Sequence, residues 1–378
     1  MKLKLARDVF SDAVQWTSRA VQQRPAIPIL AAVRLSARDG ELELSSFDYE
    51  VSARSRVEAQ VDDPGEVLVS GRMLSDIAKS LPNSAVSIEL NDSHVEVRCG
   101  RAQFSLGTMA LEDYPLLPEL PEKQGTVDAR DLAAAIGQVV IATSKDDTLP
   151  LLTGVRVEIA GPKITFLATD RYRLAQREML WNPRDIEFSA EMLVKARVLA
   201  DVARNLTSSG DVELRLNPSG VGERNAIIGF SAGERQATSS LMDGDYPPVR
   251  KLFPEATPLE YACSRVELLE AVKRVSLVVE RKTPVHLTFA DGALRLEAGQ
   301  TESAQAEESI ALISESEELR TAFNPGYLQE GLAALETEFV RFGFVHATKA
   351  AVMMGQSEAD SGADEDFKYL LMPIRFGL

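Results

Sequence analysis

The chain has 378 residues, of which 45% are hydrophobic and 26% are charged, and its formal net charge is -16. This length predicts two or three domains, each able to bury its own core. The negative charge argues against a protein that coats nucleic acid with a basic surface, although an acidic body can still carry a basic stripe. Cys99 and Cys263 are far apart, the N-terminus lacks the apolar core of a signal peptide, and no apolar run approaches the roughly 20 residues of a membrane span. We therefore expect a cytoplasmic protein with two reduced thiols.

The first predicted element is an amphipathic helix at Asp8 to Val21, where apolar residues recur at helical spacing. Alternating apolar and polar residues then predict a β-hairpin that turns at Asp39-Gly40, a typical hairpin dipeptide. A short strand, Val67 to Val69, leads into a second amphipathic helix that ends near Leu81. A further set of strands is predicted over residues 86–109.

The same order of elements is predicted twice more along the chain. In the second copy, the first helix is predicted at Asp131 to Ser144, the hairpin turn at Gly161-Pro162 and the short strand at Met192 to Val194. In the third copy, the same three elements are predicted at Glu267 to Val279, Asp291-Gly292 and Arg320 to Phe323. Three hairpins of the same length, at the same position in each copy, indicate duplication.

The second helix of each copy carries the clearest repeat. Over a shift of 125 residues, Arg72 and Lys79 of the first copy fall on Arg197 and Arg204 of the second, together with the apolar stripe. A weaker third copy, at residues 324–335, keeps the stripe and lacks the basic pair. We interpret the chain as three related parts.

Proline-rich segments at Tyr114 to Pro121 and Tyr246 to Pro258 separate the copies. We place the domains at residues 1–121, 122–253 and 254–378. Each is predicted to contain two helices packed on antiparallel sheets, an α+β plan.

No catalytic or metal-binding motif is found. His94, His286 and His346 are predicted in separate strands, and none has a cysteine or second histidine at metal-ligand spacing. Phosphate-binding loops, nucleophile elbows and zinc-protease motifs are missing from the sequence. Gly220-Val221-Gly222 fits a hairpin tip, and the acidic run Glu358 to Asp366 fits a solvated loop. We expect no catalytic activity, no metal site and no cofactor.

The repeated basic residues point to contacts with DNA phosphates, which would position the protein without reading sequence. The candidates are Arg24, Arg72, Lys79, Arg197, Arg204, Lys273 and Arg274. The alternative is that they are ordinary solvated side chains, and the nearby Asp76 and Asp201 favour it. The reproduction of the pair in two copies favours the functional interpretation.

Repeated domains can close into a ring by symmetry. Packed helices lie roughly 8 to 10 Å apart, so six helices lining a hole give a circumference of only about 50 to 60 Å. Twelve helices, from two chains arranged head to tail, give about twice that, which suits a hydrated duplex. The arithmetic favours a dimer.

Six segments, in order, resemble the bacterial DNA polymerase III β subunit family, the β sliding clamps. They are RPAIPIL, LTGVRVE, LATDRYRLA, DGDYPPVRKLFP, FNPGYL and the terminal YLLMPIRFGL. The RYRLA form resembles the actinobacterial branch. The resemblance implies a homodimeric ring of six domains that encircles duplex DNA, is opened by a clamp loader and tethers the replicative polymerase.

The resemblance also implies a groove between the second and third domains that binds short peptides of partner proteins. Carried over to this chain, the groove residues are Leu152, Thr169, Arg171, Tyr172, Arg173, Leu174, Pro247, Lys251, Leu252, Asn324, Tyr327, Leu370, Met372, Pro373, Ile374 and Arg375. Without the resemblance, the segment Leu370 to Ile374 would be read as a terminal core strand. An edge strand could both pack in the core and line a groove.

Three departures from the family affect this groove. Arg171 and Tyr172 stand where many members have a small residue and a histidine, which should narrow one subsite. Lys251 replaces an arginine, which weakens a bidentate contact to a peptide carboxylate. Phe376 to Leu378 extend the tail. The alternative function is a tandem-domain interaction scaffold that keeps the groove but does not load on DNA; an enzyme is a more distant third.

Overall fold

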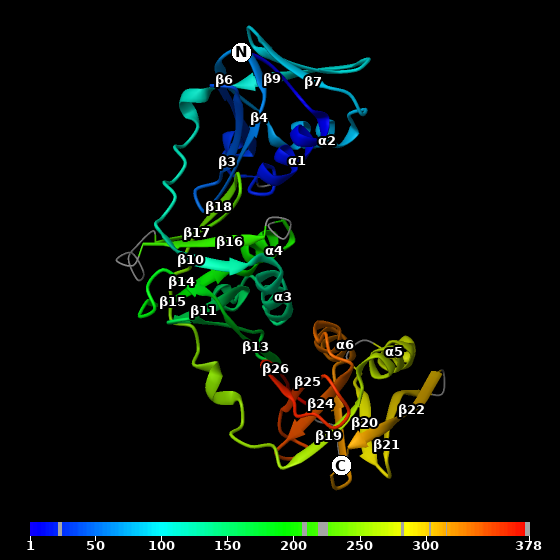
Figure 1. The fold of residues 1–378 in the computed structure, drawn as a ribbon. Coiled ribbons are helices and arrows are strands. Elements are labelled where there is room, and N and C mark those ends of the chain that lie inside the picture. Colours follow the sequence, from blue (N-terminus) through cyan, green and yellow to red (C-terminus); the bar gives the residue numbers. More distant parts are fainter. Residues whose placement is uncertain are drawn as a thin grey trace. The chain divides into compact units, whose positions relative to one another are not determined.

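The structure is a computed structural model that describes residues 1–21, 25–205, 210–217, 226–280, 283–301, 304–314 and 316–374 (Figure 1). These residues form two compact units. The first contains Met1–Ala133, Trp181–Phe188 and Arg197–Leu241, and the second contains Ala134–Leu180, Ser189–Ala196 and Met242–Leu378. A continuous antiparallel sheet organises each unit, with 14 strands in the first and 12 in the second.

The three repeats have the same order of elements, except that the third has no counterpart of the short strands β5 and β14 among the described residues. This order confirms the predicted threefold duplication and the α+β plan. The first repeat consists of β1 (Lys2–Leu5), α1 (Arg7–Thr17), β2 (Ala32–Arg38), β3 (Glu41–Phe47), β4 (Val51–Glu58), β5 (Gln60–Asp63), β6 (Gly65–Ser70), α2 (Gly71–Ser80), β7 (Val86–Asn91), β8 (His94–Cys99) and β9 (Ala102–Met109). The second consists of β10 (Lys123–Asp128), α3 (Ala129–Val140), β11 (Gly154–Ala160), β12 (Lys163–Thr169), β13 (Arg173–Leu180), β14 (Asn182–Pro183), β15 (Ser189–Lys195), α4 (Ala196–Asn205), β16 (Asp211–Leu216), β17 (Ile227–Ala232) and β18 (Arg235–Ser240). The third consists of β19 (Leu259–Ser264), α5 (Arg265–Val275), β20 (Val285–Ala290), β21 (Ala293–Thr301), β22 (Ala304–Ser314), β23 (Leu319–Phe323), α6 (Pro325–Ala334), β24 (Phe339–Phe344), β25 (Ala351–Gln356) and β26 (Asp364–Leu371).

Short 3-10 helices connect these elements. They are η1 (Pro28–Ala31), η2 (Leu111–Asp113), η3 (Pro150–Thr153), η5 (Val249–Leu252) and η6 (Ser276–Val278). Two of them, η3 and η5, lie in the second unit beside the candidate site described below.

All three predicted hairpin turns are confirmed. Asp39-Gly40 and Asp291-Gly292 both have positive φ at each central residue, between 51° and 81°. This backbone matches the twist of a two-residue hairpin and is tolerated best by glycine and aspartate. The third turn places Gly161 at φ 56°, followed by Pro162.

The first helix of each repeat ends earlier than predicted. α1 ends at Thr17 rather than Val21, α3 at Val140 rather than Ser144, and α5 at Val275 rather than Val279. In each case turns with three-residue hydrogen-bond spacing follow, such as the Val21 amide to the Ser18 carbonyl at 3.3 Å. Apolar spacing continues through these tighter turns, so periodicity could not locate the helix end.

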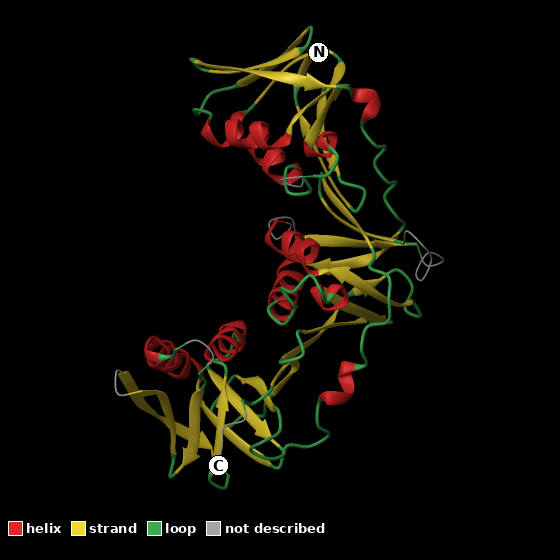
Figure 2. Cartoon of the chain, turned by 180° about the vertical axis from the view of Figure 1, so that it is seen from behind, coloured by secondary structure: helices red, strands yellow, loops and turns green. Residues whose placement is uncertain are grey.

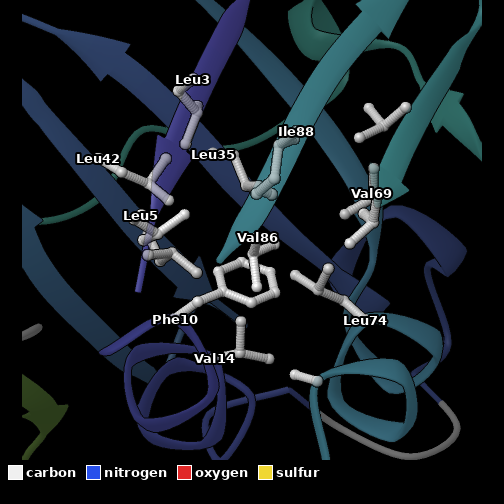
Figure 3. Packing of buried hydrophobic residues seen from close by; sticks show 14 of the residues in the cluster. Leu3, Leu5, Phe10, Val14, Leu35, Leu42, Val69, Leu74, Val86 and Ile88 are labelled. Carbon is white, nitrogen blue, oxygen red and sulfur yellow. The ribbon is translucent and has the colours of Figure 1, made fainter. Parts of the chain in front are cut away.

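Figure 3 shows how the first repeat buries its apolar stripes. Phe10 and Val14 of α1 and Leu74 of α2 point toward Leu35 and Val86 of the strands, and all are fully buried. The spacing that predicted these helices therefore corresponds to the face that packs on the sheet. Figure 2 shows the same chain by secondary structure, with helices in red and strands in yellow.

Strand pairing joins neighbouring repeats within each unit. In the first unit, β4 of the first repeat pairs with β18 of the second, with Ser52 opposite Thr238. In the second unit, β13 of the second repeat pairs with β26 of the third, with Leu174 opposite Leu370. β26 also pairs with β25, so it has a partner on both sides. The core strand predicted at Leu370 to Ile374 is confirmed for Leu370 and Leu371, and Met372 to Ile374 follow its end.

The structure also places the remaining predicted histidine, acidic, glycine and cysteine positions. His346 lies in the turn after β24 rather than in a strand, and Asp364 to Asp366 of the acidic run belong to β26 rather than to a loop. The predicted tip at Gly220 to Gly222 lies outside the described residues. Within the described ranges, Cys99 and Cys263 are buried free thiols. In that same part of the chain, no cluster of three or more acidic, histidine or cysteine residues could hold a metal, and no helix is long and apolar enough to cross a membrane.

Candidate functional site

Three of the predicted groove residues share one apolar cluster in the second unit. Leu152 from η3, Leu174 from β13 and Leu370 from β26 are buried together. The other buried members are Leu167, Leu193, Tyr246 and Val249, and partly buried residues pack around them, including Leu151, Met242 and Phe253. Leu174 and Leu370 lie against each other because they are directly opposite in the register of β13 and β26.

Exposed apolar side chains come from the elements that surround this cluster. Tyr172 is 55% exposed, Met372 46% and Leu252 60%. The Met372 amide donates to the Tyr172 carbonyl at 2.9 Å, so the end of β26 stays paired to the β12–β13 loop. Lys251 and Pro247, on or just before η5, are exposed as well. Large apolar residues left in solvent beside a buried cluster are typical of a binding surface.

The β12–β13 loop is held by side-chain to backbone hydrogen bonds. One carboxylate oxygen of Asp170 accepts from the amides of Tyr172 (3.0 Å) and Arg173 (3.1 Å). The Thr169 amide donates to the Tyr246 hydroxyl at 3.0 Å, and the Thr169 hydroxyl accepts from the Arg171 amide at 3.1 Å. Arg171 has φ 81°, a left-handed conformation that costs a non-glycine residue about 1 kcal/mol.

The Arg173 side chain is bound by protein groups and is only 3% exposed. Its guanidinium forms ion pairs with Asp170 (2.9 Å) and Glu330 and donates to the Tyr369 hydroxyl at 3.3 Å. It also lies 4.3 Å from the centre of the Tyr327 ring. Burial alone would lower the pKa of Arg173, but Tyr369, Glu330 and Asp170 outweigh burial and raise it. Because side chains alternate along a strand, Arg173 lies on the opposite face of β13 from Leu174.

Helix α6 contributes two predicted residues. Asn324 is its N-cap and accepts from the amides of Gly326 (2.9 Å) and Tyr327 (3.2 Å). Tyr327 stacks on Tyr172 with ring centres 6.3 Å apart. The Ile374 amide donates to the Ala322 carbonyl at 2.8 Å, which fixes the chain after β26. Pro373 is partly exposed, and Arg375 lies outside the described residues.

Sequence reasoning missed four residues on which this geometry depends: Asp170, Tyr246, Glu330 and Tyr369. A signal for one of them was present, because Asp-Tyr-Pro occurs at both 113–115 and 245–247. Tyr114 accepts the Phe47 amide at 2.7 Å, just as Tyr246 accepts the Thr169 amide. Burial raises the pKa of both tyrosines to about 12. The repeated tripeptide therefore marks a tyrosine that anchors the equivalent loop in two repeats.

The predicted basic residues fall into two groups. Arg72 and Lys79 of α2 and Arg197 and Arg204 of α4 are exposed. Of these four, only Arg204 forms an ion pair among the described residues, with Asp201 at 3.9 Å, and Arg197 attracts the same carboxylate without an ion pair. On α5, Lys273 pairs with Glu270 at 2.8 Å and Arg274 pairs with Glu308. Arg24 lies outside the described residues. The positive charges of α2 and α4 are therefore less neutralised by ion pairs than those of α5.

Asp201 is the acidic residue that sequence analysis placed beside the α4 basic pair. Burial raises its pKa, while Arg19, Arg204 and Arg197 act in the opposite direction. Arg19, Arg197 and Asp201 also line a cavity of about 30 Å³ between α1, β4, α4 and β18. Arginines from two repeats thus surround one half-buried carboxylate.

The three repeats, their pairing through antiparallel strands and the two helices in each are the architecture of a DNA-clamp protein. Three consecutive family models match, those of the N-terminal, central and C-terminal domains of the DNA polymerase III beta subunit, at residues 1–118, 126–248 and 250–375. The chain belongs to this family, the beta sliding clamps. As a member it is a non-catalytic subunit rather than an enzyme.

Individual relatives agree with this assignment. The chain is 46% identical to the beta sliding clamp of Streptomyces coelicolor over 99% of both chains. It is 48% identical to that of Micrococcus luteus over 82% of this chain and 98% of the relative. These relatives place it in the actinobacterial branch, as predicted. A crystal structure of the Pseudomonas aeruginosa sliding clamp bound to griselimycin matches with a TM-score of 0.88, 27% identity and full coverage of both chains.

Proposed function

We propose that two copies of this chain form a ring around duplex DNA and tether the replicative polymerase and other proteins through the groove beside β13 and β26. A clamp loader would open the ring, and the protein would act in the cytoplasm. The observation that carries the ring is the edge-to-edge pairing of repeats through β4–β18 and β13–β26.

By order in the repeat, β9 corresponds to β18 and β26, and β22 corresponds to β4 and β13. Among the described residues, Ala102 to Gly107 of β9 pair only with β8, and Ala304 to Ile310 of β22 pair only with β21. An exposed strand edge is a template for a further strand. Pairing β22 of one copy with β9 of another would repeat the same junction, and two such contacts close a head-to-tail dimer of six repeats.

The basic residues support contact with the DNA backbone. Arg72, Lys79, Arg197 and Arg204 would meet phosphates, with Arg24, Lys273 and Arg274 as further contacts. Contacts to phosphate release counterions and do not read sequence, so the ring could slide. The domain boundaries at 121 and 253 remain our proposal for where one repeat ends and the next begins.

The encircling mode is tested by retention on a singly nicked circular plasmid after loading, compared with the same plasmid linearised. We expect the loaded protein to stay on the circular plasmid and to be lost from the linear one. Equal retention on both would favour the alternative, an interaction scaffold that does not load on DNA.

Charge reversal tests the DNA-facing helices. Arg72→Glu with Lys79→Glu should lower loading strongly, because these cations have no ion-pair partner among the described residues. Lys273→Glu with Arg274→Glu is the matched comparison and should have a smaller effect, because both cations already face carboxylates. Equal effects of the two pairs would contradict the assignment.

For the groove, we propose that its lining comprises fifteen of the sixteen residues given by the family resemblance, and that the sixteenth, the buried Arg173, supports the β12–β13 loop from the opposite face of β13. The variant Leu174→Ser with Leu370→Thr installs the polar pair found at the equivalent positions of β4 and β18. Calorimetric titration with griselimycin, the ligand of the Pseudomonas relative, should show binding to the wild type and loss in the variant. Ser52→Ala is the control, and unchanged binding in the groove variant would refute the site.

A further inference from the structure

Arg171 presents a cation beside the exposed aromatic ring of Tyr172, in the proposed groove. The residue is exposed, and its guanidinium lies 5.9 Å from the centre of the Tyr172 ring. Tyr172 stacks on Tyr327, whose other neighbour is the guanidinium of Arg173. Arg171, Tyr172, Tyr327 and Arg173 thus form one row in which each side chain contacts the next. The attraction between the Arg171 guanidinium and the Tyr172 ring restricts where Arg171 can place its charge.

The charges around Arg171 leave it available to a ligand. The nearby carboxylates of Asp170 and Glu330 both form ion pairs with Arg173, which lies two residues after Arg171 in the chain. Asp146 is an acidic group that Arg171 attracts. Hydrogen bonds from Thr148 and, to a smaller extent, the positive charge of Arg171 hold the pKa of Asp146 below its usual range. Asp146 is fully exposed, so solvent screens this attraction. No ion pair joins Arg171 to a carboxylate within the described part of the chain.

The backbone at Arg171 adds a second argument. Its φ of 81° lies in the left-handed region, which glycine adopts freely and arginine does not. The loop geometry is set by Asp170 and Thr169, whose side chains accept the amides of residues 171 to 173. The fold therefore does not need an arginine side chain here, and strained residues that the surrounding structure holds in place are often found at ligand sites.

Resting on the proposed groove, we propose that Arg171 is a specificity-determining residue that selects peptides carrying an aspartate or glutamate side chain. The chain as a whole has a net charge of -16 and repels acidic ligands at long range. The Arg171 cation, which has no ion-pair partner among the described residues, would reverse that preference at the proposed groove. Arg173 cannot do so, because its guanidinium is buried and fully engaged.

The test uses synthetic seven-residue peptides with leucine and phenylalanine as apolar anchors. Aspartate is placed at each remaining position in turn, and each peptide has a twin with asparagine at that position. Affinities for the full-length protein are measured by calorimetry at low and high salt. Arg171→Gln removes the charge and keeps the length, Arg171→Lys keeps a charge, and Arg171→Gly relieves the backbone. Lys163→Gln, on the same hairpin and paired with Glu178, is the charge control.

We expect at least one aspartate peptide to bind the wild type roughly threefold to tenfold more tightly than its twin at low salt. The ratio should fall toward one in Arg171→Gln and Arg171→Gly and at high salt, and part of it should persist in Arg171→Lys. Arg171→Gly should also melt at a higher temperature, so lost selectivity could not be attributed to unfolding. Lys163→Gln should retain the wild-type ratio.

Equal affinities of all twins for the wild type would overturn the inference, as would an unchanged ratio in Arg171→Gln. Binding of griselimycin without binding of any peptide would overturn this inference and leave the groove in place. Failure of both griselimycin and every peptide to bind would overturn the proposed groove itself, and Arg171 selectivity with it.

Discussion

The junction of the first and second repeats and the junction of the second and third use the same strands in the same register, yet their side chains differ on both faces. On one face, Ser52 and Thr238 form a buried hydrogen bond of 2.6 Å where the later junction has Leu174 and Leu370. A satisfied polar pair leaves no apolar surface for a partner. The later junction presents leucines at the same points and can therefore carry a groove.

On the opposite face the second junction again has the larger side chains. Val51 and Ala237 of the first junction correspond to Arg173 and Tyr369 of the second, as the strand registers show. Val51 and Ala237 border the cavity of about 30 Å³. Arg173 and Tyr369 are buried and bind each other, and they also contact the partly exposed Glu330 and Tyr327. The same strand junction therefore only joins the repeats in the first unit, whereas in the second unit it also supports the proposed groove.

The largest expected effect comes from removing the buried cation of the second junction. Arg173→Met leaves Asp170 and Glu330 without their partner, which should destabilise the region by about 3 kcal/mol. Val51→Ala, at the equivalent position of the first junction, should cost only about 1 kcal/mol. Hydrogen exchange at the amides of β13 and β26, compared with β4 and β18, measures both. Equal losses would mean that the network contributes no more than packing does.

Gly331 of α6 gives a second contrast, because Val202 stands at its equivalent position in α4. A Cβ at Gly331 would lie 2.6 Å from the Tyr369 ring. Gly331→Ala should therefore destabilise the protein by about 1 kcal/mol net, despite the better helix propensity of alanine. Gly137→Ala in α3, where a Cβ meets nothing within 4 Å, should instead raise the melting temperature. Stabilisation by both substitutions would contradict the close fit of Tyr369.

A smaller effect is expected at the polar pair of the first junction. Ser52→Ala leaves the Thr238 hydroxyl buried without its partner and should cost about 1 kcal/mol. Adding Thr238→Val should recover part of the loss, because no unpaired hydroxyl then remains. Chemical denaturation of the single and double variants measures this coupling, and strictly additive losses would show that the hydrogen bond is unimportant.

The smallest effect is expected from filling the cavity. Ala237→Val adds two methyl groups beside Val198 and Val202 and should stabilise the first unit by about 0.5 kcal/mol. The melting temperature is the measurement. A decrease would show that the space is too small or is occupied by water.

Much of this protein was determined by local sequence. The threefold repeat, the hairpin turns and the apolar helix faces follow from periodicity and from residues such as Asp39-Gly40 that only certain turns accommodate. The helix C-termini were misplaced because tight turns preserve the same apolar spacing. The family motifs also identified residues that the fold brings together, among them Leu152, Leu174 and Leu370.

Only the tertiary structure decided how the repeats join and what each candidate residue touches. Strand pairing between residues 196 positions apart places Leu174 against Leu370, and pairing with β25 makes β26 an interior strand. The same pairing encloses Arg173 and leaves Arg171 exposed, although the two arginines are separated by a single residue. Sequence spacing cannot distinguish them, because burial and charge pairing depend on which distant strand or helix is packed against each side chain.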